Sequence, residues 1–230
     1  MDSTSHQNAV GVAVATFVKS PALSPVKTRL AKDIGRDEAT AFYGLCWRAV
    51  WEVLRECRDS SDDWHPYWAV AEQEALDQWP DFPSLWQGEG GLGERLASIS
   101  SQLFRNHSEV FFIGADCPQI SCDLLQKARL ALRDREFVLG PANDGGFYLL
   151  AARKPVPRDV WLEVPYSADD TLREISSRLA AYGKVGELEV LADADHGSDL
   201  PEIFGALQQL AVRNRGHEAL LRWLNDRVEA

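Results

Sequence analysis

The stretch that decides the fold is AVGVAVATFVKSPALSPVKTRL, residues 9–30. Its first ten residues form a continuous apolar run rich in β-branched side chains, which is typical of a strand buried on both faces of a parallel sheet. A loop with two prolines follows the strand and leads to Lys27 and Arg29. Open α/β sheets bind their ligands beyond the carboxyl ends of the strands, so this basic loop is the first candidate for a binding site.

The remaining sequence alternates between apolar strands and helical patterns. Further strands are expected at residues 67–71, 109–114, 136–140, 147–152 and 187–192. Helices are expected at residues 38–58, 93–106, 121–132, 167–182 and 198–228, with caps at Ser121, Ser167 and Ser198 and an interruption near 214–216. The alternation predicts an α/β fold with a mostly parallel sheet and helices on both faces. A turn at 143–146 adds one antiparallel insertion, and residues 78–93, rich in glycine and proline, are expected to form a loop.

The composition excludes several classes of protein. The 230 residues include 35 acidic and 24 basic side chains, a net charge of −11, whereas proteins that bind nucleic acid or anionic membranes need a cationic face. The longest apolar run is far shorter than the ~20 residues of a membrane-spanning helix. The four cysteines show neither a disulfide framework nor a zinc motif, so we expect reduced thiols and a cytoplasmic protein. Residues 1–8 are expected to form a disordered tail and residues 9–230 one domain, as a monomer or a homodimer.

The basic loop lies in a part of the chain whose charge differs from the rest. Residues 1–36 hold five basic and two acidic side chains, a local charge of +3 in an acidic protein. Lys19, Lys27 and Arg29 would converge at the strand end, where Arg can bind phosphate oxygens in a bidentate manner and Lys adds a point charge. The loop has no Walker A or dinucleotide-binding glycine pattern, but its cations suit a di- or triphosphate. The alternative is a solvated basic turn.

Acidic residues follow two other predicted strands. Asp116 comes two residues after the strand at 109–114, and Asp193 and Asp195 follow the last strand. Carboxylate oxygens at strand ends suit Mg²⁺ or Mn²⁺, which bridge to substrate phosphates. Asp116 and Asp195 are therefore the predicted metal ligands if the two strands are neighbours, with Asp193 and His196 open as alternatives for the second ligand. The alternative role of Asp116 is a hydrogen bond within its own turn.

Two glycine-rich segments complete the set of candidates. Asp144, Gly145 and Gly146 are typical of a hairpin turn, and a double glycine also lets a substrate approach the backbone closely. In the second segment, residues 87–95, the side-chain amide of Gln87 can form hydrogen bonds with a nucleobase. Backbone amides at the predicted helix start can bind an anion. The alternative there is a flexible loop. The candidate nucleotide-binding residues of this segment are Gln87, Gly91, Gly93, Glu94 and Arg95.

Five motifs occur in the order and spacing of a known bacterial family: FVKSPALSPVKTRLA, GGLGERLA, IGADCP, LGPANDGGFYLL and DADHGSDL. On these motifs the chain resembles, over residues 9–205, a GT-A-fold family formerly classed as a domain of unknown function and described as nucleotide-diphospho-sugar transferases or glycosyltransferases. It is also similar to phospholactate guanylyltransferase and the molybdenum-cofactor guanylyltransferases. The roles that the resemblance implies are phosphate binding for Lys19, Lys27 and Arg29, base contact for residues 87–93, metal binding for Asp116 and Asp195, and acceptor contact for Asp144, Gly145 and Gly146.

The resemblance further implies a metal-dependent transferase that uses a nucleotide, with Lys27, Arg29 and Asp116 as catalytic residues. Glycosyl transfer from a nucleotide-diphospho-sugar to a small-molecule acceptor is the expected reaction. The alternative is nucleotidyl transfer from a nucleoside triphosphate to a small phosphorylated acceptor, with release of pyrophosphate. Both reactions need cations that neutralise the charge on a phosphate leaving group. A third alternative is a non-catalytic nucleotide-binding domain on the same fold.

Overall fold

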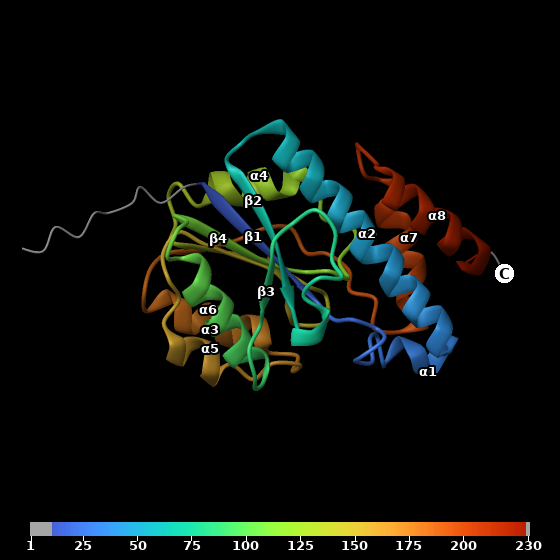
Figure 1. The fold of residues 1–230 in the computed structure, drawn as a ribbon, viewed down its shortest axis with the longest axis horizontal. Coiled ribbons are helices and arrows are strands. Elements are labelled where there is room, and N and C mark those ends of the chain that lie inside the picture. Colours follow the sequence, from blue (N-terminus) through green and yellow to red (C-terminus); the bar gives the residue numbers. More distant parts are fainter. Residues whose placement is uncertain (1–10, 229–230) are drawn as a thin grey trace, which may run out of the picture.

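The computed structural model describes residues 11–228, which build a seven-stranded sheet covered by helices on both faces (Figure 1). The strands are β1 (Val12–Val18), β2 (Trp64–Val70), β3 (Ser84–Trp86), β4 (Glu109–Gly114), β5 (Phe137–Pro141), β6 (Phe147–Ala152) and β7 (Val185–Glu187). Their order across the sheet is β3-β2-β1-β4-β6-β5-β7, and of these seven strands β6 runs antiparallel to its neighbours. The predicted α/β fold with one antiparallel insertion is confirmed. The predicted tail at residues 1–8 lies outside the described residues.

Successive residues of β1 point to opposite faces of the sheet. Val12 and Val14 join the core on one face, and Ala13 and Ala15 join the core on the other, which is why the strand is apolar throughout. The first face is covered by α2 (Arg36–Ser60) and α4 (Cys122–Ala131), and the second by α3 (Leu92–Leu103), α5 (Arg158–Glu163) and α6 (Thr171–Ala180) (Figure 1).

Three more helices share a further core with α2: α1 (Leu30–Ile34), α7 (Leu200–Gln208) and α8 (Arg215–Val228), with α7 packed on α8. Phe42 of α2 lies against Trp223 of α8, with 5.5 Å between ring centroids. The buried His217 of α8 also reaches the loop after β4, where its Nε2 lies 2.9 Å from the Pro118 carbonyl oxygen. The C-terminal helices therefore support both α2 and one of the loops at the carboxyl edge of the sheet.

The structure corrects several local expectations. Residues 78–93 are not a loop throughout, because Ser84–Trp86 form β3 by pairing with the end of β2. Ser121 caps α4 as predicted, and its Oγ accepts a hydrogen bond from the Leu124 amide. Ser167 does not cap a helix: α6 begins only at Thr171, and the φ of Ser167 is +62°, in the left-handed region. Ser198 lies in a short 3₁₀ turn ahead of α7 rather than at a helix cap, and the predicted interruption near 214–216 corresponds to the break between α7 and α8.

The expectation of four reduced thiols is wrong for this structure. Cys57 of α2 and Cys122 of α4 form a disulfide. The two helices lie side by side on one face of the sheet, which brings together residues that are 65 positions apart in the chain. Cys46 and Cys117 are free and buried, and burial raises the pKa of both thiols. Neither free thiol is therefore an activated nucleophile.

The arrangement of the strands determines where the candidate residues meet. The carboxyl ends of β1, β4, β5 and β7 lie at one edge of the sheet, with the amino end of β6.

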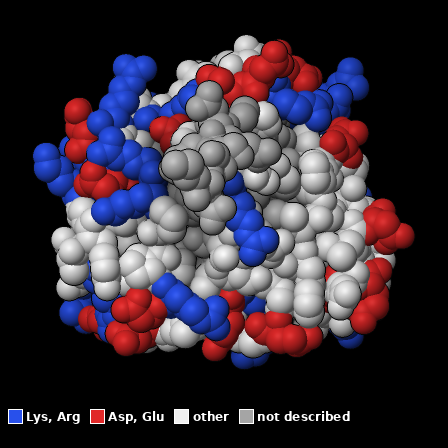
Figure 2. Space-filling view, turned by 60° about the vertical axis from the view of Figure 1, so that its left-hand side comes forward, with Lys and Arg blue, Asp and Glu red and all other residues white. Residues whose placement is uncertain are grey.

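On the side of the molecule where β1 begins, acidic and basic side chains are interspersed (Figure 2). Of the helices described, none is long and apolar enough to cross a membrane.

Candidate active site

Lys27 lies at the centre of the site, and its side chain is only 4% exposed. Its Nζ is 2.8 Å from Asp116 Oδ2, 3.0 Å from Asp193 Oδ1 and 3.9 Å from Asp195 Oδ1. The φ of Lys27 is +43°, in the left-handed region that residues other than glycine rarely adopt. The ion pairs offset this backbone strain, which is of a kind that concentrates at functional sites.

These contacts determine the charge states of the cluster. Burial lowers the pKa of the Lys27 ammonium, but Asp116 and Asp193 outweigh burial and raise that pKa well above its usual range. Burial raises the pKa of Asp116, but the ammonium outweighs it and holds the pKa of this carboxyl below its usual range. Burial also raises the pKa of Asp193, and there Lys27 offsets only part of the effect. At neutral pH the centre of the site is therefore an ammonium paired with the Asp116 carboxylate.

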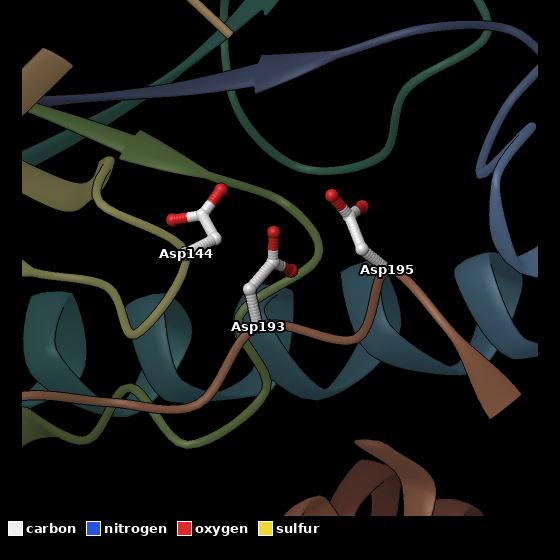
Figure 3. A group of neighbouring side chains, drawn as sticks. All are labelled: Asp144, Asp193 and Asp195. Atoms are coloured by element: carbon white, nitrogen blue, oxygen red, sulfur yellow. The ribbon is translucent and has the colours of Figure 1, made fainter. Parts of the chain in front are cut away.

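A second feature is a group of three carboxylates around the same space. Asp144 comes from the turn between β5 and β6, and Asp193 and Asp195 come from the segment after β7 (Figure 3). One oxygen from each lies within 4.8 Å of the others, and together they could hold a metal ion. Of the two predicted metal ligands, Asp195 belongs to this group and Asp116 does not, so metal binding by the pair Asp116 and Asp195 stays a prediction. Asp116 is joined to the group through Lys27.

Hydrogen bonds from neighbouring loops hold this group in place. The backbone amide of Asp193 donates to Asn143 Oδ1 at 2.9 Å, which ties the segment after β7 to the β5–β6 turn. The side-chain amide of the buried Gln119 donates to the Ala192 carbonyl oxygen at 2.8 Å, which ties the same segment to the loop after β4. The three loops that carry the carboxylates are therefore fixed to one another.

The other predicted phosphate-binding residues surround this cluster. Arg29 is half exposed, and its Nη1 lies 2.5 Å from Asp195 Oδ2. Lys19 is exposed, while its backbone amide and carbonyl are both hydrogen-bonded to the Tyr43 hydroxyl. His196, an alternative metal ligand, lies apart from the carboxylate group, with its Nδ1 3.3 Å from Asp33 Oδ2. The basic loop therefore offers Arg29 and Lys19 to solvent and keeps Lys27 inside.

The glycine-rich segment before α3 serves largely to build its own turn. Gln87 is buried, and its Nε2 donates to the Ala69 carbonyl oxygen at 2.8 Å. The Gly91 amide donates to Glu94 Oε2, and a Cβ on Gly93 would lie 2.4 Å from a backbone oxygen of α5. The Nε of Arg95 donates to the Gly90 carbonyl oxygen in the same turn. Base contact by this segment stays a prediction, since Gln87 is turned toward the strands β1 and β2.

The charge of the cluster fits a divalent cation. Four carboxylates (Asp116, Asp144, Asp193 and Asp195) face two cations (Lys27 and Arg29). Two negative charges remain, and every potential ligand atom is a carboxylate oxygen, the donor that Mg²⁺ and Mn²⁺ prefer. The residues present therefore fit the predicted Mg²⁺ or Mn²⁺.

Some residues of the site carry no signal that sequence reasoning used. Asn143 and Gln119 act through single hydrogen bonds to backbone atoms of the segment after β7. Asp144 was predicted as an acceptor contact, and the structure places it within the carboxylate group as well. The signal that could have identified Asn143 and Asp144 as site residues is their position, since both are polar and follow the end of a predicted strand.

Comparison with known families confirms the resemblance drawn from the motifs. Residues 58–168 match the family DUF2064, described as an uncharacterized protein conserved in bacteria. A crystal structure from Desulfovibrio desulfuricans G20, provisionally named a nucleotide-diphospho-sugar transferase, is 25% identical with a TM-score of 0.82. The match covers 96% of this chain and 97% of that protein. A search of curated proteins found no match.

More distant solved structures share the fold alone. The 4-diphosphocytidyl-2C-methyl-D-erythritol synthase of Anaerococcus prevotii DSM 20548 is 12% identical, with a TM-score of 0.55 over 88% of this chain and 100% of that one. A CMP:2-keto-3-deoxy-manno-octonic acid synthetase in complex with CTP is 11% identical, with a TM-score of 0.50 over 86% of this chain and 99% of that one. The chain thus has the fold of nucleotide-using transferases.

Proposed function

We propose that this protein is a metal-dependent glycosyltransferase that takes a nucleotide-diphospho-sugar as donor and a small molecule as acceptor. The observation that carries the proposal is the cluster around Lys27, where four carboxylates and two cations from loops after β1, β4, β5 and β7 converge. The 25% identity to the Desulfovibrio protein over nearly the whole chain supports the same class of donor.

In this proposal the residues divide into two tasks. Asp195, Asp193 and Asp144 would hold Mg²⁺ or Mn²⁺, which supplies positive charge next to the leaving diphosphate. Lys27 keeps Asp116 ionised and fixed in position, and Arg29 and Lys19 reach the phosphate oxygens from the solvent side. Positive charge placed in advance where the leaving group gains negative charge stabilises the transition state.

The burial of Lys27 bears on the choice of leaving group. The Lys27 ammonium is buried and committed to carboxylates, whereas Lys19 and the half-exposed Arg29, which is paired with Asp195, are the two cations of the basic loop that a phosphate can reach from solvent. Two cations with one divalent ion suit a nucleoside diphosphate better than a triphosphate with its additional charge. Nucleotidyl transfer from a triphosphate to a phosphorylated acceptor is the second candidate, and a release of Lys27 from its carboxylates on binding would favour it.

A thermal-shift panel tests the proposal. We expect UDP or GDP to raise the melting temperature in the presence of Mn²⁺ or Mg²⁺; at a hundredfold excess over Kd a ligand stabilises by about 2.7 kcal/mol, roughly 5 to 11 °C for a chain of this length. Asp195→Asn should lose the metal-dependent part of the shift. Asp226→Asn, an exposed carboxylate of α8, is the matched control and should keep it.

Product analysis separates the two reactions. Free nucleoside diphosphate released from a sugar nucleotide supports glycosyl transfer, whereas pyrophosphate released from one triphosphate in the presence of an acceptor supports the second candidate. Nucleotide binding that is independent of metal, with neither product formed, would favour the non-catalytic nucleotide-binding domain. No shift with any nucleotide would contradict all three readings.

A further inference from the structure

A pocket of about 230 Å³ opens next to the carboxylate group. It lies between the start of α3, the ends of β1 and β4, the start of β6 and the segment before α6. Its wall is mainly apolar and aromatic and includes Phe17, Leu96, Phe112, Phe147 and Tyr166. The pocket shares Asp144 with the candidate metal group, so one end of any occupant meets the site at this carboxylate.

The hydroxyl groups of the lining, apart from that of Ser167, already have partners. They donate to backbone carbonyl oxygens: Thr171 to Pro165 (2.8 Å), Tyr166 to Trp161 (3.0 Å) and Tyr148 to Glu189 (3.1 Å). The polar side chains left for an occupant are Ser167 and Asp144, both exposed at the rim. Asp144 offers its Oδ2, because its Oδ1 accepts a hydrogen bond from the Gly146 amide at 2.8 Å. Among the described residues that line the pocket, none is a lysine or an arginine.

The two sides of the pocket mouth are fixed to each other. The Gly145 carbonyl oxygen accepts a hydrogen bond from the Leu172 amide at 2.8 Å. Gly145 has a φ of +86°, and a Cβ there would lie 2.1 Å from the Asp169 carbonyl oxygen. The β5–β6 turn and the segment before α6 therefore touch backbone to backbone, so the pocket exists before any ligand binds.

We infer that this pocket receives the acceptor and selects an uncharged alcohol or phenol with an apolar body of about one substituted ring. The inference rests on the proposed function, which supplies the donor. A cavity of ~150 Å³ lined by apolar side chains is known to hold benzene, so this larger pocket accommodates a ring with one or two substituents. The acceptor hydroxyl then lies at Asp144, at the end of the pocket that meets the carboxylate group.

Other occupants fit the chemistry less well. A sugar ring or a nucleobase would bring several hydroxyl or amide groups against a wall whose own polar groups are already paired, and buried polar groups without partners cost free energy. A phosphorylated acceptor would place its anion where the lining offers no cation. An apolar body buries its surface against the five aromatic rings of the lining at no such cost.

Binding of 4-fluorobenzyl alcohol, followed by fluorine NMR on the whole protein, tests the inference. We expect a dissociation constant of about 1 mM, which is ordinary for a fragment of this size. Ala168→Phe fills the pocket from the segment before α6 and should weaken binding of the alcohol at least tenfold. Ala180→Phe, the same change at an exposed position of α6 outside the lining, is the matched control and should bind like the natural protein. Phe147→Trp, at a partly buried lining position at the start of β6, is a second filling variant and should weaken binding as well.

Affinity for UDP with Mn²⁺, measured on the same samples, shows whether the variants fold and whether the donor site works. Unchanged UDP affinity with weakened alcohol binding in both filling variants supports the inference. Displacement of the alcohol by glucose or by glycerol 3-phosphate, or equal alcohol binding in all variants, would overturn it. UDP binding without any alcohol binding would overturn it and leave the proposed function standing. Alcohol binding without any nucleotide binding would remove the proposed function and leave only an apolar binding pocket, which would overturn the acceptor role.

Discussion

Replacement of Lys27 by methionine probes the centre of the site. The change keeps most of the apolar stem of the side chain and removes the ammonium from between its carboxylate partners. At an effective dielectric constant of ~20, each of the contacts at 2.8 and 3.0 Å is worth roughly 5 to 6 kcal/mol in attraction. Most of this attraction offsets the cost of burying the charges, so the net loss is much smaller than the sum of the contacts.

The expected loss of stability follows from the exposure of the partners. Removal of one member of a buried ion pair costs about 3 to 5 kcal/mol, because the other charge stays behind uncompensated. Asp116 is 39% exposed, and solvent screens part of its interaction, so we expect Lys27→Met to cost about 3 kcal/mol. At a urea m-value of about 2 to 3 kcal/mol/M, the midpoint of unfolding falls by roughly 1 M.

Equilibrium urea unfolding at pH 7, without divalent ions, measures this effect. Lys32→Met is the control, because Lys32 is an exposed lysine of the neighbouring helix α1 and should leave the midpoint unchanged. Equal midpoints for Lys27→Met and the natural protein would refute the reasoning. That result would mean that the carboxylates move apart into solvent at no cost and that Lys27 is not their structural counter-charge.

Two further predictions concern residues that support the site. Gly145→Ala should cost about 2 to 4 kcal/mol of stability, since its φ is +86° and a Cβ would lie 2.1 Å from the Asp169 oxygen; Gly205→Ala, in a helix with free space around it, should be neutral or slightly stabilising in the same urea experiment. His217 donates from Nε2 to the Pro118 carbonyl, and burial lowers its pKa below 6.5. The unfolded chain therefore takes up a proton first as the pH falls below about 6.5, and the natural protein should lose stability there relative to His217→Gln. A constant difference between these two proteins from pH 8 to pH 5 would contradict the assignment.

The fold was predictable where both faces of a strand are buried. The apolar runs at 109–114 and 147–152 coincide with β4 and β6. Strands that helices cover on both faces are apolar throughout, so they can be recognised as continuous apolar runs in the sequence. The short elements were not predictable. Strand β3 has three residues that are only partly buried and depends on pairing with β2. Helix α5 has six residues, and it is held by the burial of Trp161 against Phe112 rather than by its own propensity.

The candidate site was predictable in its residue types but not in its pairings. Asp195 and the basic loop could be recognised because both follow predicted strands. The contact between Lys27 and Asp193 joins residues 166 positions apart, and it depends on the order of the strands, which a single sequence does not specify. The burial of Lys27 follows from that same order, so a residue expected to face a phosphate instead faces three carboxylates.

The antiparallel direction of β6 relative to its neighbours affects how the shape of the apolar pocket can change during evolution. An antiparallel neighbour is reached by a tight hairpin, whereas parallel strands require a long crossover. Phe147, just after the hairpin, and residues 166–168 line one side of the apolar pocket, while Lys27 and Asp116 lie in the crossovers that leave β1 and β4. Mutations can therefore alter the shape of the pocket without disturbing the ion pairs. Under the proposed function, substitutions at Phe147 and residues 166–168 would alter acceptor preference and leave Lys27 and Asp116 in place, whereas Asp144 belongs to both the pocket and the carboxylate group.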